Sequence, residues 1–297
     1  MKAELIDGNK IAKEVRSEVA DGVANLKDNY GVTPGLAVVL VGDDPASAVY
    51  VGMKQKAALK AGMESRDIRL PGNISEDQLI REVSELGKDP NLHGILVQLP
   101  LPEHINVTKI IGEINPSKDV DGLHPINVGL MVQGREKFVP ATPAGIQQLL
   151  VRTGYDPEGK HIVVCGRSEI VGKPLAILLM QRKRSANATV TVCHTRTKNL
   201  PEMTRQADVL IAAMGQPGII TADMVKQDAV VIDVGTNRID APEKKRGYRL
   251  VGDVDFNKVS EKASAITPVP GGVGPMTIAM LLSNTLDSAK WIAENNL

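Results

Sequence analysis

Short runs of apolar residues alternate with amphipathic segments along most of the chain. In the first half, helices are predicted from Pro45 and from Ser75, and strands at "GLAVVLVG", "SRDIRLP" and "HGILVQLPLP". Apolar strands separated by helical patterns are typical of a parallel sheet that is covered on both faces. The first half is therefore predicted as a βαβαβ arrangement, which is followed by the irregular segment "NPSKDVDGLHPINVG".

A second alternation follows "VPATPAGIQQLLVRTG", which is predicted as a helix that ends at Gly154. Helices are expected from about Gly172 and from Leu200, and strands at "HIVVCG", "ATVTVCH", "ADVLIAAMG" and "AVVIDVG". The pattern closes with the long helix "MTIAMLLSNTLDSAKWIAENN". We therefore predict an α/β protein of two domains with a boundary near residues 140–145, whose last helix follows a turn that allows it to return to either domain.

Charge and composition exclude several classes of function. Lys and Arg number 35, Asp and Glu also number 35, and there is no long run of one sign, so no general attraction to nucleic acid or to an anionic membrane is expected. Aromatic residues make up only 2% of the chain, which argues against a base-stacking platform. The N-terminal "MKAELIDGNK" has no apolar signal core, and the apolar runs have the length of strands. The prediction is a cytoplasmic protein without a membrane segment.

The two cysteines, Cys165 and Cys193, are too few for a disulfide framework or a zinc site. Both stand at the ends of predicted strands, and we interpret them as small buried core residues in a reducing compartment.

The segment "CGRSEIVGKP", residues 165–174, has the form of a phosphate-binding loop but matches neither common pattern. A Walker loop has four residues between its glycines, followed by Lys and a hydroxyl residue. Here five residues separate Gly166 from Gly172, and Lys173 is followed by proline, which argues against a triphosphate-cleaving site. The dinucleotide pattern requires a second glycine, which is missing. The predicted strand before the loop and the helix after it still favour a nucleotide site.

The strand after this loop bears on which dinucleotide is expected. In NAD-binding folds the second strand ends in Asp or Glu about 20 residues on, and that carboxylate holds the ribose 2′-hydroxyl. Here "ATVTVCHTRT" ends without a carboxylate. Guanidinium and hydroxyl groups bind a 2′-phosphate, so the candidates for an NADP phosphate pocket are Arg167, Ser168, Thr195 and Arg196. Solvated arginines beside a tight turn are the alternative interpretation.

The helix from Pro45 contains a lysine of interest. Asp44 is placed to cap the helix and Gly62 to end it. Tyr50 and Lys54 are four residues apart, so they lie on one face and present an aromatic plane beside an amine. A solvated lysine and a tyrosine at the edge of the core are the alternative.

Polar residues also follow the strand "HGILVQLPLP". Gln98 stands at its end, where ligands collect in open parallel sheets. Asp119 and Asp121 lie in "KDVDG", for which an ordinary Asx turn is the alternative. The later stretch "PVPGGVGPMT" is predicted to lack regular structure through its proline and glycine run. Its residues 268–274 are predicted to line a cleft that admits a flat ligand, or else to form a hinge before the last helix.

Together these segments resemble the bifunctional methylenetetrahydrofolate dehydrogenase/cyclohydrolase family over nearly the whole chain. The motifs that carry the resemblance are "GLAVVLVGDDPAS", "YVGMKQKA", "GILVQLPLP", "PSKDVDGLHPINVG", "TPAGI", "GRSEIVGKP", "ATVTVCHTRT", "VVIDVGTNR", "GDVDF" and "TPVPGGVGPMT". The resemblance implies two α/β domains that flank a cleft, with a parallel-sheet folate domain (residues 1–140 with the returning helix 275–297) and a Rossmann-like NADP domain (residues 141–274). It also implies a homodimer.

The resemblance implies site residues as well. Those expected to contact tetrahydrofolate derivatives are Tyr50, Lys54, Gln98, Asp121, Pro268 and Gly272. Those expected to contact NADP are Gly166, Arg167, Ser168, Ile170, Gly172, Thr195, Arg196 and Thr236. Thr236 departs from the family, which more often has Ile beside the nicotinamide, and Thr195 is often Ser.

The implied chemistry suits these residues. Loss of hydride from the substrate carbon leaves a cation that two ring nitrogens share, so this step needs alignment with nicotinamide and no catalytic metal is expected. Hydrolysis then needs proton transfer, for which Lys54 is the hypothesis, with Gln98 orienting the amine, Tyr50 stacking on the folate and Asp121 accepting hydrogen bonds from the pterin. Two alternatives stay open: a dehydrogenase with little cyclohydrolase activity, and a catalytically silent dinucleotide-binding module.

Overall fold

The structure is a computed structural model that describes residues 2–244 and 247–295, and the chain divides into two compact units. Unit 1 contains the residues up to Ala12 and Thr142–Thr277, and unit 2 contains Lys13–Ala141 and the residues from Ile278 onward. Helices α1 (Gly8–Tyr30) and α10 (Val273–Asn295) each begin in unit 1 and continue in unit 2. The two functional domains expected from the sequence, residues 1–140 with 275–297 and residues 141–274, remain a prediction. Residues 1, 245–246 and 296–297 belong to these ranges but lie outside the described residues.

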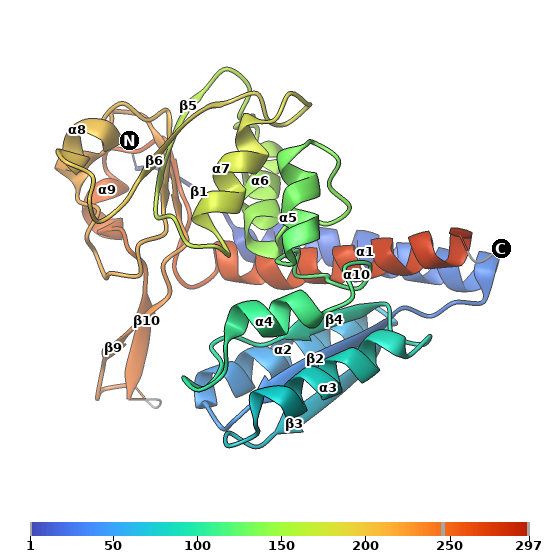
Figure 1. Cartoon of the computed structure of the whole chain (residues 1–297). Helices are drawn as coiled ribbons and strands as arrows, with labels where there is room; N and C mark the ends of the chain where they lie inside the picture. Colours follow the sequence, from blue (N-terminus) through green and yellow to red (C-terminus); the bar gives the residue numbers. More distant parts are fainter. Residues whose placement is uncertain (1, 245–246, 296–297) are drawn as a thin grey trace. The chain divides into compact units, whose positions relative to one another are not determined.

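Unit 2 is built on a three-stranded parallel sheet in the order β3-β2-β4 (Figure 1). The strands are β2 (Gly35–Val41), β3 (Glu64–Leu70) and β4 (Gly94–Val97), and every residue of β2 is buried. The helices that lie wholly within this unit are α2 (Pro45–Lys60), α3 (Glu76–Lys88), α4 (Val107–Glu113) and α5 (Pro125–Val132). The predicted βαβαβ arrangement is confirmed.

The predicted helix ends in unit 2 also form as expected. The side chain of Asp44 accepts a hydrogen bond from the backbone N–H of Ser47 at 2.7 Å, which caps α2. Gly62, with φ +81°, lies just past its end. Helix α3 begins with a capping box between Ser75 and Gln78. These local signals fix where α2 starts after β2, and thereby where its side chains lie.

Unit 1 is built on a six-stranded, fully parallel sheet in the order β1-β11-β8-β7-β5-β6 (Figure 1). Its strands are β1 (Glu4–Leu5), β5 (His161–Cys165), β6 (Thr189–Cys193), β7 (Val209–Ala212), β8 (Val230–Asp233) and β11 (Ala265–Ile266). The chain runs from β5 to β6 on one side and then returns to β7 on the other. This reversal makes the carboxyl ends of β5 and β7 the topological switch point of the sheet, where ligands bind in open α/β folds.

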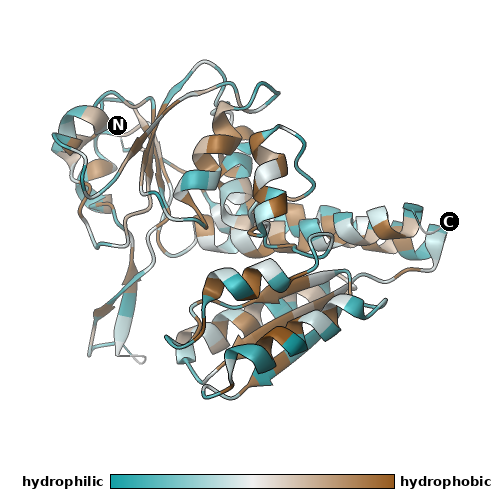
Figure 2. Ribbon diagram, in the orientation of Figure 1, coloured by the Kyte–Doolittle hydropathy of each residue, from teal (hydrophilic) through white to brown (hydrophobic). Residues whose placement is uncertain are grey.

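Helices and a hairpin complete unit 1. The helical segments are α6 (Ala141–Arg152), α7 (Gly172–Met180), α8 (Leu200–Thr204), the 3₁₀ turn η1 (Ala222–Met224) and α9 (Phe256–Val259). The antiparallel hairpin of β9 (Asn237–Asp240) and β10 (Tyr248–Val251) projects from the unit (Figure 1). Figure 2 shows hydrophobic colour on strands and on parts of the helices. Strands β7 and β8 are buried at every residue. Among the described residues no helix is both long and apolar enough to cross a membrane.

Two predictions about regular structure were wrong. Helix α10 begins at Val273, three residues before the expected Met276, so Gly274 and Pro275 are helical. The first backbone N–H groups of a helix have no partner within the helix, and a proline in the first turn therefore costs no hydrogen bond. The segment "NPSKDVDGLHPINVG", expected to be irregular, also contains the start of α5. There Pro125 follows His124, whose ring accepts a hydrogen bond from Ile126 N–H and caps the helix.

Candidate active site

Unit 2 contains a buried lysine at the carboxyl end of its sheet. Lys54 is 8% exposed, and its Nζ donates a hydrogen bond of 2.9 Å to Oε1 of Gln98. The two residues are 44 positions apart in the chain. Gln98 directly follows β4, and its backbone N–H bonds to the carbonyl of Val39 in β2 at 2.8 Å. Because α2 also starts after β2, the fold brings the amine and the amide together, as the family resemblance implied.

The surroundings of Lys54 determine its charge state. Burial lowers the pKa of the Lys54 amine, while the negative charge of Asp121 raises it. Gln98 is neutral, and its Nε2 donates to the carbonyl of Leu99 at 2.6 Å, which leaves Oε1 facing the lysine. The structure therefore holds an amine in place without a second charge in direct contact, and the net effect is a lowered pKa.

The two aspartates of "KDVDG" have separate functions in the structure. Asp119 is fully buried and accepts hydrogen bonds from the N–H groups of Leu123 and His124 and from Nδ2 of Asn127, at 3.3, 2.8 and 2.8 Å. It is the residue that organises this turn. Asp121 has no hydrogen bond among the described residues; burial raises its pKa, and the charge of Lys54 lowers it. Asp121 is thus available to a ligand beside Lys54.

Tyr50 lies one helical turn before Lys54 on α2 and is partly buried. Its hydroxyl has no hydrogen-bond partner among the residues that the structure describes. The aromatic plane and the amine are therefore on the same helix face, as expected from their spacing.

In unit 1, the loop after β5 requires both of its glycines. Gly166 has φ +138°, and a Cβ at this position would lie 2.2 Å from the carbonyl oxygen of Ala213. A Cβ on Gly172 would lie 2.1 Å from the carbonyl oxygen of Gly166. The Ser168 hydroxyl accepts a hydrogen bond of 3.2 Å from Val171 N–H, immediately before α7. The glycines are therefore needed for the loop to fold tightly onto the ends of β5 and β7.

Cationic and hydroxyl side chains gather at the ends of β5 and β6. The two strands are paired to their last residues, and Gly166 N–H bonds to the carbonyl of Cys193 at 2.9 Å, so the loops that follow them are neighbours. Arg167, Thr195 and Arg196 are all exposed there. Within the described ranges neither guanidinium group forms an ion pair. This donor set fits a phosphate group, which suits guanidinium and hydroxyl donors that are free to reach it.

Other residues of the same loop differ in character. Ile170 is 44% exposed and presents an apolar surface beside the charged groups. The one carboxylate in the loop, that of Glu169, forms an ion pair with Lys173 one helical turn later. Its negative charge is thereby partly balanced.

The remaining predicted residues lie near the ends of β8 and β11. Thr236 is exposed just after β8, and Pro268 follows β11. The backbone of Gly272 makes a close approach, but to the chain itself: a Cβ on Gly8 would lie 1.8 Å from the Gly272 carbonyl oxygen. Asn9 N–H also bonds to the carbonyl of Gly271 at 3.1 Å. Small residues are thus needed here for packing against the start of α1, and contact of Pro268 and Gly272 with substrate stays a prediction.

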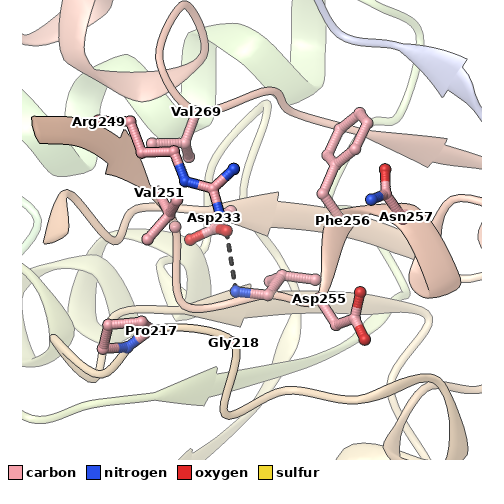
Figure 3. A pocket seen from close by; sticks show the side chains of 11 residues that line it. Pro217, Gly218, Asp233, Arg249, Val251, Asp255, Phe256, Asn257 and Val269 are labelled. Atoms are coloured by element: carbon pink, nitrogen blue, oxygen red, sulfur yellow. Dashed lines mark hydrogen bonds between the residues drawn. The ribbon is translucent and has the colours of Figure 1, made fainter. Parts of the chain in front are cut away.

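Sequence reasoning missed two buried aspartates in unit 1, Asp233 and Asp253, which are 3% and 0% exposed. Asp233 forms part of the wall of a pocket of about 380 Å³ near Arg249, and Figure 3 shows its hydrogen bond to the N–H of Val254. Burial raises the pKa of Asp233 to about 6. The signal in the sequence was an aspartate within two residues of a glycine in both "VVIDVG" and "LVGDVDF".

The cysteines are buried, as predicted, and are paired in register across β5 and β6. Burial raises the pKa of the Cys165 thiol to about 12, which keeps it protonated. No group of three or more His, Cys, Asp or Glu side chains in residues 2–244 and 247–295 is placed to hold a metal ion.

Two family models match the chain. Residues 6–121 match the tetrahydrofolate dehydrogenase/cyclohydrolase catalytic domain, and residues 140–293 match the NAD(P)-binding domain of the same family. The chain is 55% identical over 286 residues to the bifunctional protein FolD of Prosthecochloris aestuarii, covering 96% of this chain and 97% of the relative.

Solved structures agree with these matches. The bifunctional FolD enzyme of Campylobacter jejuni is 47% identical, with a TM-score of 0.91 over 99% of this chain and 100% of that one. The FolD of Trypanosoma brucei, solved with NADP cofactor and an inhibitor, is 41% identical, with a TM-score of 0.93 over 98% of each chain. Matches to both family models, together with this identity over nearly the whole length, establish that the chain belongs to the tetrahydrofolate dehydrogenase/cyclohydrolase family.

Proposed function

We propose that this chain is a bifunctional enzyme of one-carbon metabolism. It oxidises 5,10-methylenetetrahydrofolate to the 5,10-methenyl form with NADP and hydrolyses that product to 10-formyltetrahydrofolate. The observation that carries the proposal is the buried contact of 2.9 Å between Lys54 Nζ and Gln98 Oε1, since hydride transfer alone does not need an amine with a tuned pKa. The family membership reported above supports both activities.

The cofactor is assigned to the carboxyl edge of the sheet in unit 1. When bound, NADP supplies the hydride acceptor. Arg167 and Arg196 supply positive charge for its 2′-phosphate, and Ser168 and Thr195 supply hydroxyl donors. The exposed guanidinium groups and the lack of a carboxylate at the end of β6 support NADP over NAD, whose ribose 2′-hydroxyl pairs with a carboxylate. The remaining cofactor candidates are Gly166, Ile170, Gly172 and Thr236.

The hydrolytic step is assigned to Lys54. A free lysine has a pKa of about 10.4 and is protonated at neutral pH, so it acts as a base there only if its pKa is lowered. Burial lowers it in this structure, and a cationic substrate beside the amine lowers it further. Neutral Lys54 removes a proton from the attacking water, and Gln98 Oε1 keeps the amine oriented.

Tyr50 and Asp121 are assigned to substrate binding. The Tyr50 ring offers a stacking surface to the flat folate, one turn from the amine. Asp121, whose carboxylate has no hydrogen bond among the described residues, accepts two hydrogen bonds from the amide-like edge of the pterin. Pro268 and Gly272 complete the proposed substrate contacts.

One assay tests the proposal. Purified protein is mixed with methylenetetrahydrofolate and either NADP or NAD, and the reduced cofactor and the methenyl compound are followed separately. We expect reduction of NADP without accumulation of the methenyl compound. No reduction with either cofactor contradicts an enzyme of this class, accumulation of the methenyl compound selects a dehydrogenase with little cyclohydrolase activity, and a strong preference for NAD contradicts the phosphate pocket.

The chain is further proposed to form a homodimer in the cytoplasm, as its family resemblance implies. Sedimentation velocity tests the assembly, and a single species with the mass of one chain at micromolar concentration contradicts it.

A further inference from the structure

The side chain of Asp253 accepts hydrogen bonds from two segments that are distant from each other in the sequence. Its Oδ2 accepts hydrogen bonds from the N–H groups of Met214 and Gly215, at 2.6 and 2.9 Å. Its Oδ1 accepts from Gln216 N–H at 2.9 Å and from Nδ2 of Asn237 at 2.8 Å. One fully buried carboxylate thus holds the loop after β7 and the first residue of β9.

Asp233 continues the same network. Its Oδ1 accepts from the N–H groups of Gly235 and Asp253 at 3.0 and 2.9 Å, and its Oδ2 accepts from Val254 N–H at 3.0 Å (Figure 3). The neighbouring glycines leave room for these carboxylates. A Cβ on Gly252 would lie 1.8 Å from Asp233 Oδ2, and a Cβ on Gly235 would lie 2.3 Å from Asp253 Oδ1. The two aspartates and two glycines therefore form one packed unit.

The segments held by this network border the switch point of the sheet. The loop 214–216 follows Ala213, against which Gly166 packs, so it forms the wall of the crevice opposite the loop after β5. Thr236 lies between Gly235, which is bound to Asp233, and Asn237, which is bound to Asp253. Both segments that face the proposed cofactor from the β7 and β8 side therefore depend on the same carboxylates.

We infer that Asp253 is a positioning residue for NADP: it fixes the loops after β7 and β8 in the conformation that receives the cofactor, without touching it. This inference rests on the proposed function. A carboxylate suits the task because it offers only acceptors, and here four donors converge on it. An amide in its place turns a donor toward N–H groups and leaves buried donors without partners.

The substitution Asp253→Asn tests the inference. We expect the dissociation constant for NADP, measured by calorimetry without folate, to rise about tenfold or more, because small displacements of positioning groups have large effects. The KM for NADP should rise with it. Cyclohydrolase activity on methenyltetrahydrofolate, assayed without cofactor, should stay at the wild-type level, as should kcat for reduction at saturating NADP. The matched control is Asp255→Asn, whose carboxylate accepts from Lys258 N–H at the start of α9 and does not reach either loop.

The outcomes separate positioning from a general structural effect. An unchanged dissociation constant in folded Asp253→Asn protein overturns the inference, and so does a parallel loss of both activities. If that variant does not fold, Asn237→Ala decides, since it removes only the contact from Nδ2: weaker NADP binding with intact cyclohydrolase activity supports the inference, and unchanged binding overturns it. A wild-type chain without either activity contradicts the proposed function instead.

Discussion

Each of the two units has a pair of wholly or partly buried aspartates, and the pairs are used differently. In unit 2, Asp119 is saturated by three donors, whereas Asp121 has none among the described residues and acts on the charge of Lys54. In unit 1, both Asp233 and Asp253 are saturated by donors that are mostly backbone N–H groups. In unit 2, one carboxylate without hydrogen bonds within the described ranges raises the pKa of a nearby amine. In unit 1, both carboxylates are used in hydrogen bonds.

The side chains proposed to bind ligands also differ between the two units, in how far they are buried. Lys54 is buried, where a shifted pKa is obtained from desolvation. Arg167 and Arg196 are exposed, where a guanidinium stays charged and is free to move onto a phosphate. Burial suits the group that must lose a proton, and exposure suits the groups that must hold a charge.

The largest effect is expected from Lys54→Met, which replaces the amine with an apolar chain of similar length. Loss of a general base typically costs about a hundredfold to ten-thousandfold in rate, so cyclohydrolase kcat should fall by that factor. The dissociation constant for NADP should not change, because the cofactor candidates lie in unit 1. The measurement is methenyltetrahydrofolate hydrolysis followed by absorbance.

The matched control for this change is Lys56→Met, an exposed lysine on the same helix. It should hydrolyse the methenyl compound at the wild-type rate. Full cyclohydrolase activity in Lys54→Met would remove the lysine from the mechanism and leave unit 2 without an assigned base.

A smaller effect is expected from Arg196→Ala. Hydrogen bonds to charged groups contribute about 1.5–3 kcal/mol, so kcat/KM with NADP should fall about tenfold to a hundredfold. The value with NAD, which lacks the phosphate, should stay the same. Arg182→Ala is the control, since Arg182 is exposed just after α7 and away from the ends of β5 and β6. Equal losses with both cofactors would show that Arg196 does not contact the 2′-phosphate.

The next prediction concerns the pH dependence of hydrolysis. Asp121 raises the pKa of Lys54 by its charge, in opposition to burial, and Asp121→Asn removes that charge. The amine then becomes neutral at a lower pH, so the rising limb of the profile of kcat/KM against pH should move to lower pH. The KM for folate should also rise, because the amide accepts fewer hydrogen bonds from the pterin. A profile that moves to higher pH would contradict the role of Asp121 as the opposing charge.

Much of the fold could be predicted because the signals are local. The apolar runs that form β2, β5 and β8 and the cap at Asp44 need only neighbouring residues to be recognised. The hairpin β9–β10 was missed, since its strands are short and largely exposed and charged residues interrupt their apolar pattern. The early start of α10 was missed because proline and glycine were taken as breakers, although the first turn tolerates both.

The candidate site was predictable only where spacing or resemblance applied. Tyr50 and Lys54 share a helix face, which the interval of four residues already indicates. Asp253 lies in the motif "GDVDF", which contributes to the resemblance but says nothing of a role for this carboxylate. The loop that it holds lies 37 to 39 positions away and is brought to it only by the order of the strands. The role of Asp119 as organiser of its turn was foreseen only as an alternative, since sequence does not show which of two nearby carboxylates faces inward.

The smallest effect is expected from Thr236→Ile, which restores the residue that the family more often has. Thr236 is exposed and carries no charge, and its exchange leaves in place the hydrogen bonds that hold its neighbours Gly235 and Asn237. Exposed substitutions that break no such contact usually change free energies by less than about 0.5 kcal/mol. The KM for NADP should therefore change by no more than about two- to threefold, while Asp253→Asn changes it far more. Initial rates at varied NADP concentration measure both variants side by side. If Thr236→Ile had the larger effect on the KM, cofactor binding in unit 1 would depend mainly on packing against the side chain at position 236. The buried carboxylates that hold its neighbours would then contribute less to cofactor binding than that side chain.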